Sequence, residues 1–226
     1  MTSVERAVNA PGFDRRELLQ TLLSAAQDNT TLALGVYVWS EEVVQWLLPA
    51  LRRGGFTGRI LLGGPQITYA PAGVLSLYPD ADLAIRGPGE DALLAALRSP
   101  DPTKVPGVIV RNGGDRCVQA KSELGALPSP ILDGVLPVQP FMRWETQRGC
   151  IYACTFCQHR APNRDSRPGL LAQSRVNREI EAMVRGGVRR HRRPGSHLSH
   201  QPRRAGHPAA VRGARVHRAA LTTVAV

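Results

Sequence analysis

The sequence predicts an α/β protein built on a doubly wound parallel sheet, and three observations support this prediction. Short apolar runs of strand length alternate with segments of helical spacing through residues 12–99. The apolar runs are rich in strand-forming residues and continuous, which is typical of parallel strands buried on both faces. Glycine turns follow two of the runs, at the points where such a chain would leave the sheet.

The individual elements follow in order along the chain. Residues 12–27 carry leucines at helical spacing, and no strand is expected before them. Residues 31–39 (TLALGVYVW) predict a buried strand. Ser40 then begins a predicted helix, with two glutamates in its first turn, Pro49 as a point where it is expected to kink or shorten, and Gly54 and Gly55 at its end. The next predicted elements are a strand at 58–65, a short helix at 70–80, a strand at 81–87 and a helix at 87–99.

Residues 99–140 differ from the preceding part of the chain. They are rich in proline and glycine, which favours a linker. One hairpin is expected at 107–120 (GVIVRNGGDRCVQA), with NGG as its turn and Cys117 as a thiol within it. We expect a domain boundary near residue 135.

The charge is distributed unevenly along the chain. The formal net charge is +11, but nine arginines and no Lys, Asp or Glu lie from Arg189 onward, so the first 188 residues carry 20 basic residues against 18 acidic ones. The first part therefore has no nucleic-acid signature. No apolar run is long enough to span a bilayer, and the first residues lack the layout of a signal peptide, so we expect a cytoplasmic protein without a membrane contact.

The turns that follow the predicted strands form a candidate ligand site. Ligands of open parallel sheets bind beyond the carboxyl ends of the strands, where glycines allow a close approach of the backbone. Each turn taken alone also fits a plain loop or a helix cap. Neither a dinucleotide fingerprint nor a P-loop motif is present. The candidate residues are Ser40, Gly63, Gly64, Pro65, Gly87, Gly89 and Glu90.

Three of the four cysteines form the motif C-x3-C-x2-C at Cys150, Cys154 and Cys157. Such spacing lets several thiolates point to one metal centre from a single loop, and a [4Fe–4S] cluster held by three of them keeps one iron open. Zinc bound by the three cysteines and His159 is an alternative, although structural zinc sites usually use two separated pairs. Three unrelated thiols are the remaining alternative.

The stretch ETQRGCIYACTFC resembles the cluster-binding loop of the radical S-adenosylmethionine superfamily, including the aromatic Phe156 before the last cysteine. The resemblance implies that the three cysteines hold a [4Fe–4S] cluster, that S-adenosylmethionine chelates its open iron, and that Phe156 packs near the adenine. A packed core aromatic is the other interpretation of Phe156. PFMRWETQRG looks like the first strand of the partial α/β barrel of this superfamily, and SRVNREIEAMVRGGVRR looks like its first helix, with Ile180 and Met183 facing the core.

The upstream sheet, with GGPQITYAP and the RGPGE turn, resembles the Rossmann-like (flavodoxin-like) cobalamin-binding domain that precedes the radical domain in one subgroup. The resemblance implies that the glycine turns and Ser40 approach the corrin. The D-x-H-x-x-G loop that supplies an axial histidine in other cobalamin proteins is absent here. The implied domains are an N-terminal helical segment at 1–28, a cobalamin-binding-like domain at 29–100, a linker with hairpin at 101–138, the start of the radical domain at 139–190, and a basic tail at 191–226.

The resemblance also implies a reaction. One S-adenosylmethionine methylates cobalamin, and another yields a 5′-deoxyadenosyl radical that abstracts hydrogen from an unactivated carbon, which then takes the methyl group. The implied partners are a small-molecule or peptide substrate and an electron donor such as flavodoxin or ferredoxin. The alternatives are a radical cyclase or rearrangement enzyme, a cobalamin-binding module without catalysis, and a basic nucleic-acid-binding protein with a zinc knuckle.

The tail has no apolar periodicity and no acidic residue, which predicts a disordered or out-of-frame segment. Permitted codons for residues 191–202, read one nucleotide later, encode IAVLDPIFHTNP, a strand followed by the D-x-x-F-x-x-N pattern of the family. Out-of-frame text from GC-rich DNA is also rich in Arg and Pro. A nucleic-acid-binding tail is the alternative, although it would lack lysine and aromatic residues. We therefore expect a frameshift near residue 190 and a chain that is inactive as written.

Overall fold

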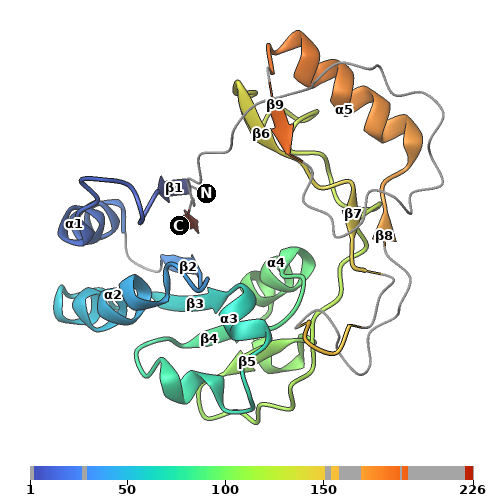
Figure 1. Cartoon of the computed structure of the whole chain (residues 1–226). Coiled ribbons are helices and arrows are strands. Elements are labelled where there is room, and N and C mark those ends of the chain that lie inside the picture. Colours follow the sequence, from blue (N-terminus) through green and yellow to red (C-terminus); the bar gives the residue numbers. More distant parts are fainter. Residues whose placement is uncertain are drawn as a thin grey trace. The chain divides into compact units, whose positions relative to one another are not determined.

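A computed structural model of the chain describes residues 3–26, 30–150, 154–157, 169–188, 190–192 and 222–225 (Figure 1). The chain divides into two compact units. Unit 1 comprises Met1–Ser122 and Val216–Val226, and unit 2 comprises Glu123–Arg215. Unit 1 contains the predicted parallel sheet, and unit 2 contains the cysteine motif. No helix among the described residues has the length and apolar character needed to cross a membrane.

The sheet of unit 1 has six strands in the order β1-β10-β2-β3-β4-β5. Its centre is parallel, because β2 pairs with β3 and β3 with β4 in the same direction. The remaining strands are antiparallel to their neighbours. The bounds are β1 (Ser3–Arg6), β2 (Thr31–Gly35), β3 (Arg59–Gly63), β4 (Leu83–Ile85), β5 (Val108–Val110) and β10 (Thr222–Ala225).

Helices cover both faces of this sheet, as the doubly wound prediction requires. Leu32 and Ile60 share a buried cluster with side chains of the two helices α1 and α2. The alternate residues Leu61 and Leu83 share a second cluster with Ala92 of α4. The helical segments are α1 (Arg15–Ala25), α2 (Glu41–Arg53), α3 (Pro65–Thr68), η1 (Val74–Leu77), α4 (Glu90–Arg98) and η2 (Pro102–Lys104).

Local chemistry explains where the helices begin and end. The carboxylate of Asp14 accepts a hydrogen bond from the backbone N–H of Arg16 at 2.7 Å, which caps α1. Helix α2 has Glu41 and Glu42 in its first turn and runs through Pro49 as one helix to Arg53, so the expected shortening at Pro49 does not occur. The predicted helix at 70–80 is a single 3₁₀ turn, η1.

Two predictions for unit 1 were wrong. A strand, β1, precedes the first helix, although none was expected there. The hairpin at 107–120 does not form: the described segment that returns after NGG contains no strand, and the backbone N–H of Ala120 donates to the carbonyl of Arg86 at 2.8 Å rather than to β5. Asp115, in the expected second strand, instead forms an ion pair of 2.6 Å with the buried Arg86. A buried charge pair is costly to break, so this contact helps to fix the returning segment.

Unit 2 contains one β/α/β unit. Strand β6 (Phe141–Arg143) runs parallel to β9 (Arg190–Arg192), and helix α5 (Gln173–Arg185) lies between them in sequence. A two-stranded antiparallel pair, β7 (Gln147–Arg148) with β8 (Gly169–Leu170), flanks the cysteine motif. The expected core positions of α5 are confirmed, since Met183 is buried and Ile180 packs against the same cluster.

The segment predicted as a linker contributes to the core of unit 2. Leu124 is buried with Trp144 and Met183, and the partly buried Leu127 and Ile131 pack against them. The segment is thus a structural part of this unit rather than a free connection. The interpretation of the tail falls mainly on residues 193–221, which lie outside the described residues.

Candidate functional site

The predicted ligand residues follow the carboxyl ends of three parallel strands. Gly35, the last residue of β2, is in register with Gly63, the last residue of β3, and β4 runs parallel beside β3. The loops after these strands therefore leave the sheet at the same edge. At this edge Gly63 ends β3, Gly64 follows it and Pro65 begins α3, while Gly87 and Gly89 lie between β4 and α4, which begins at Glu90.

Gly63 and Gly64 differ in what surrounds them. Gly64 has a φ of 99°, and a Cβ there would lie 2.7 Å from the carbonyl oxygen of Val36, so only glycine fits. This close approach lets the backbone N–H of Gln66 donate to the Val36 carbonyl at 3.2 Å. A Cβ on Gly63 would meet no atom within 4 Å. Gly64 therefore allows the loop after β3 to pack against the loop after β2. Gly63, by contrast, borders space that a ligand could occupy.

The loop after β4 is held in a similar way. Gly87 has a φ of 83°, and a Cβ there would lie 2.8 Å from the carbonyl oxygen of Ala120. Its backbone N–H donates to the hydroxyl of Thr68 at 3.0 Å, which connects this loop to the one after β3. Gly89 has room around it, since the nearest atom to a Cβ there would be 3.8 Å away, and the exposed Glu90 begins α4.

The hydroxyl of Ser40 makes its hydrogen bonds within the protein. Its side chain is fully buried, and its Oγ accepts a hydrogen bond from the backbone N–H of Tyr37 at 3.1 Å. The same oxygen lies 3.3 Å from the carbonyl of Gly35, to which it can donate. The hydroxyl therefore closes the turn between β2 and α2, and contact of Ser40 with a ligand stays a prediction.

The sequence analysis did not predict an apolar surface in the loop after β2. The sequence suggested a strand through residue 39, but β2 ends at Gly35, so Tyr37, Val38 and Trp39 lie in the loop of the candidate edge. The rings of Tyr37 and Trp39 are stacked, with centroids 4.9 Å apart and planes at 8°. Val38 is 73% exposed and Trp39 is 39% exposed. Such exposed apolar surface beside stacked rings suits a large planar ligand.

A buried polar network ties α2 to the neighbouring loops. The carboxylate of Glu41 accepts one hydrogen bond from the amide of Gln66 at 2.6 Å and another from the hydroxyl of Tyr78 at 2.8 Å. Burial raises the pKa of Tyr78, and its hydrogen bond to the Glu41 carboxylate raises it further, so the phenol stays protonated. These contacts between distant segments of the chain carried no local sequence signal.

The cysteine loop begins directly after β7. Gly149, with a φ of 99°, turns the chain before Cys150. Cys154 and Cys157 lie on one turn, in which the backbone N–H of Cys157 donates to the carbonyl of Cys154 at 3.1 Å. Cys154 is exposed, Cys150 and Cys157 are half-buried, and none of the four cysteines forms a disulfide. Residues 151–153 and His159 lie outside the described residues.

The described residues contain no group of three His, Cys, Asp or Glu side chains that is close enough to hold a metal ion. The three thiols are thus on one loop but do not converge in this structure. Their chemistry fits an iron–sulfur cluster, because three cysteines that form no disulfide lie within eight residues. Phe156 is 90% exposed, so it is not the core aromatic of the alternative interpretation.

A buried carboxylate in unit 2 was also missed. Glu179 of α5 accepts hydrogen bonds from the indole of Trp144 at 2.5 Å, the hydroxyl of Ser129 at 2.6 Å and the guanidinium of Arg175 at 2.9 Å. Burial alone would raise the pKa of Glu179, but the three hydrogen bonds and the charge of Arg175 lower it on balance. This network anchors the chain six residues before Cys150.

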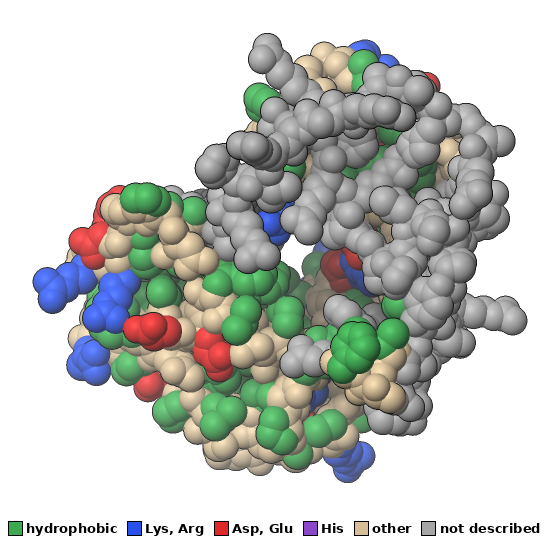
Figure 2. Space-filling view, viewed as in Figure 1, with side chains coloured by type: hydrophobic (Ala, Val, Ile, Leu, Met, Phe, Trp, Pro, Cys, Tyr) green, Lys and Arg blue, Asp and Glu red, His purple; other side chains and the backbone are tan. Residues whose placement is uncertain are grey.

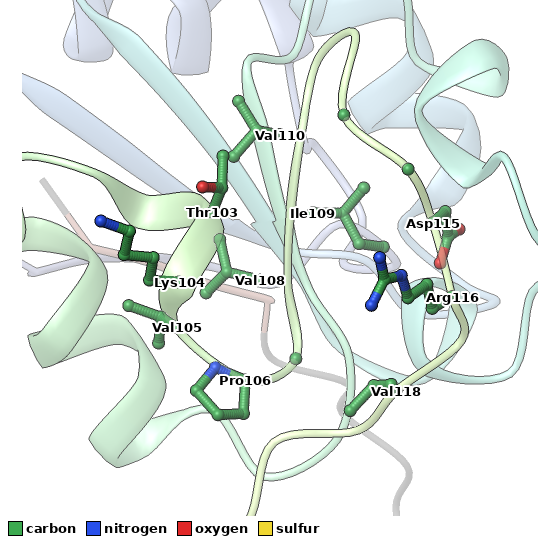
Figure 3. Close-up of a pocket in the computed structure, with 13 residues that line it drawn as sticks. Thr103, Lys104, Val105, Pro106, Val108, Ile109, Val110, Asp115, Arg116 and Val118 are labelled. Atoms are coloured by element: carbon green, nitrogen blue, oxygen red, sulfur yellow. The ribbon is translucent and has the colours of Figure 1, made fainter.

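A hollow of about 520 Å³ lies elsewhere on unit 1, along η2, β5 and the segment 113–118. Figure 3 shows Val108 and Val110 on one side of β5, and Ile109 on the other, toward Asp115 and Arg116. None of the predicted ligand residues lines it. On the face of the described residues that Figure 2 shows, Lys and Arg side chains are interspersed with acidic ones, which does not suggest a nucleic-acid surface.

Comparisons with known proteins connect both units to one family. No protein-family model matches the chain. The chain is 30% identical over 198 residues to 2-(S-pantetheinyl)-carbapenam-3-carboxylate methyltransferase from Streptantibioticus cattleyicolor, a match covering 76% of this chain and 29% of that protein. It is 32% identical over 158 residues to the cobalamin-dependent radical SAM methyltransferase TokK from Streptomyces tokunonensis, covering 62% of this chain and 23% of that one.

The fold is also found among solved structures. The cobalamin-dependent S-adenosylmethionine radical enzyme OxsB, solved with aqua-cobalamin bound, matches with a TM-score of 0.57 and 19% identity over 78% of this chain and 26% of that chain. At this identity the likeness shows the shared fold. The chain spans less than a third of the length of either curated relative.

The longer sequence match includes both candidate sites. One stretch that covers 76% of 226 residues necessarily contains the middle of the chain, and with it the glycine loops and the cysteine motif. The parallel sheet of unit 1 agrees with the Rossmann-like prediction. The chain is therefore a relative of cobalamin-dependent radical S-adenosylmethionine methyltransferases over most of its own length.

Proposed function

We propose that unit 1 binds cobalamin and that unit 2 holds a [4Fe–4S] cluster, as parts of a radical S-adenosylmethionine enzyme that transfers a methyl group to an unactivated carbon. One observation carries the proposal. A single chain combines glycine loops at the carboxyl edge of a parallel sheet with the C-x3-C-x2-C loop, and both lie within the match to a methyltransferase.

Each group has a defined set of candidate residues. In unit 1, Gly63 leaves space for a bulky ligand, and the exposed Val38 and Trp39 offer apolar surface at the same edge. In unit 2, Cys150, Cys154 and Cys157 would hold the cluster as thiolates. When bound, the cluster and S-adenosylmethionine supply a carbon radical, and cobalamin supplies the methyl group.

The residues of the chain orient these groups and do not carry out the chemistry themselves. The exposed ring of Phe156 lies on the cysteine turn, where it can cover the adenine of S-adenosylmethionine. Glu179 fixes Trp144 and thereby the strand that leads to the cysteine loop. The reaction also needs a one-electron donor such as flavodoxin or ferredoxin, and a small-molecule or peptide substrate. The proposed compartment is the cytoplasm, where thiols stay reduced.

The composition of β9 favours a second proposal, which concerns the chain as written. This strand has the sequence Arg-His-Arg, although it pairs in parallel with β6 in a β/α/β unit. Parallel strands of such units are ordinarily apolar. A change of reading frame near residue 190 accounts for the charged strand and the acid-free segment after it. A chain with this segment would not close a barrel, and it would act as a cobalamin-binding module without catalysis.

Anaerobic reconstitution of the 226-residue chain with ferrous iron and sulfide tests the cluster. We expect about four iron atoms per chain, a charge-transfer absorption band, and loss of both in Cys154→Ala. Cys117→Ala is the matched control, because Cys117 is exposed but lies in unit 1, and it should keep the iron. Iron content that is insensitive to Cys154→Ala, or zinc binding in its place, would contradict the assignment. Cobalamin binding without a cluster would favour the non-catalytic module.

A further inference from the structure

The most buried charged side chain of the described residues lies at the candidate edge. Arg86 directly follows β4, and its side chain is 1% exposed. Its guanidinium donates to the carbonyls of Ile67 at 2.8 Å, Ala70 at 2.7 Å and Pro71 at 2.8 Å, with a longer contact of 3.3 Å to the carbonyl of Thr68. All four carbonyls belong to the chain that leaves β3. One side chain after β4 therefore holds the loop after β3.

Asp115 completes this arrangement from a third segment. Its carboxylate, 5% exposed, accepts two hydrogen bonds from Arg86, at 2.6 Å to Nη2 and 3.1 Å to Nε. It also accepts from the backbone N–H groups of Gly73 at 2.9 Å and Cys117 at 3.0 Å. Burial works against the charge, but the hydrogen bonds and the Arg86 cation lower the pKa of Asp115 to about 2, so the pair stays ionised.

The pair adjoins both glycine loops. Gly87, next to Arg86, donates its backbone N–H to the hydroxyl of Thr68, and Thr68 also offers its carbonyl to Arg86. The loop that begins at Gly64 and the loop that contains Gly87 are thus joined through one buried guanidinium. Bidentate pairing fixes orientation as well as distance, which a lysine could not reproduce.

We infer that Arg86 and Asp115 are positioning residues of the ligand edge. They hold the loop after β3 and the loop after β4 at a fixed separation, so that the edge is formed before a ligand arrives. The inference rests on the proposed cobalamin site for its functional consequence. The fixed arrangement of the two loops can be tested without a ligand.

The chain contains a matched control ion pair at the opposite ends of the same strands. Arg52 donates to the carbonyls of Phe56, Gly58 and Asp80 and forms an ion pair of 2.6 Å with Asp82. Asp82 also accepts from the backbone N–H of Ile60 at 2.7 Å. The Arg52–Asp82 pair has the same chemistry as the Arg86–Asp115 pair, but it lies at the amino ends of β3 and β4. It should stabilise unit 1 without affecting the ligand edge.

The test combines amide hydrogen exchange of the ligand-free chain with titration by hydroxocobalamin, at a temperature where circular dichroism shows each variant folded. In Asp115→Asn we expect exchange at residues 65–74 and 87–90 to accelerate at least 10-fold and the Kd for hydroxocobalamin to rise at least 10-fold. Arg86→Lys should show the same faster exchange and the same rise of the Kd. Asp82→Asn should leave exchange in these loops unchanged and the Kd within 2-fold of wild type. If Asp115→Asn does not fold, Asp115→Glu keeps the charge and makes the same comparison.

The outcomes separate the inference from the proposed function. Unchanged loop exchange in Asp115→Asn, or an equal rise of the Kd in Asp82→Asn, would overturn the positioning role. If loop exchange accelerates in Asp115→Asn but the wild-type chain binds no hydroxocobalamin, the positioning role of Arg86 and Asp115 would be supported. The proposed cobalamin site would be overturned.

Discussion

Replacing Glu179 by Gln should destabilise unit 2 by about 2–3 kcal/mol at neutral pH. The buried carboxylate accepts hydrogen bonds from Ser129, Trp144 and Arg175, and all three partners act as donors to it. Glutamine keeps one acceptor oxygen but turns an amide toward these donors, so at least one charged hydrogen bond is lost. The cost stays below the roughly 3–5 kcal/mol of a fully broken buried pair, because Arg175 keeps the carbonyls of Leu127 and Pro128.

Urea unfolding followed by the fluorescence of Trp144 measures this effect. Trp39 and Trp46 belong to unit 1, so Trp39→Phe and Trp46→Phe leave a single reporter in unit 2. The matched control is Glu181→Gln. Its side chain is 66% exposed on the same helix, and its contact with Arg185 is 4.0 Å long. This control should change the free energy of unfolding by less than about 0.5 kcal/mol.

The pH dependence gives an independent check. Because the pKa of Glu179 is lowered in the folded chain, its stabilisation is fully present above its ordinary pKa of 4.5 and is lost as the pH falls below that value. The difference between wild type and Glu179→Gln should therefore be constant from pH 8 to pH 6 and shrink below about pH 4. A difference under about 0.5 kcal/mol at pH 7, or one that does not change with acid, would refute the reasoning.

Other predictions concern single residues and the gene. Gly64→Ala should lower the free energy of unfolding of unit 1 by about 1–3 kcal/mol, because a Cβ there would lie 2.7 Å from the Val36 carbonyl, whereas Gly63→Ala meets no atom within 4 Å and should be nearly neutral; equal thermal stability of the two variants would contradict this. Tyr78→Phe removes one hydrogen bond to Glu41 and should cost about 1–2 kcal/mol in urea unfolding, while a neutral result would mean that the bond adds no stability. Sequencing the gene again across codons 180–200 should show one base more or fewer than the reading frame that encodes this chain. A sequence that agrees with this reading frame would contradict the frameshift proposal.

Elements with local signals were predictable from the sequence. Strands β2 and β3 are continuous apolar runs, and α2 and α4 carry acidic first turns, so their existence follows from residues close in the chain. Parallel topology brings the loops after the strands to one edge, which is why the glycines could be grouped from the order of strands and helices alone. Strand β1 was missed because its sequence, SVER, contains a single apolar residue.

Contacts between distant residues could not be predicted in the same way. Arg86 and Asp115 are 29 positions apart, and no local pattern of the sequence signals that they pair. The role of Ser40 depends on a turn that buries its hydroxyl, which an N-cap pattern does not show. Glu179 occupies a buried position of α5 that an apolar stripe would assign to a hydrophobic residue, and only Trp144 and Ser129 explain its presence.

Titration of the 226-residue chain with hydroxocobalamin, followed by the corrin absorption bands, tests the central claim most directly. The account predicts saturable binding of one cobalamin per chain. It also predicts at least 10-fold weaker binding by Gly63→Val, which would fill the space at the edge, and unchanged binding by Gly125→Val, where the nearest atom to a Cβ would be 4.0 Å away and the residue is exposed on unit 2. Absence of binding by the wild type, or equal binding by both variants, would contradict the assignment of this edge to cobalamin.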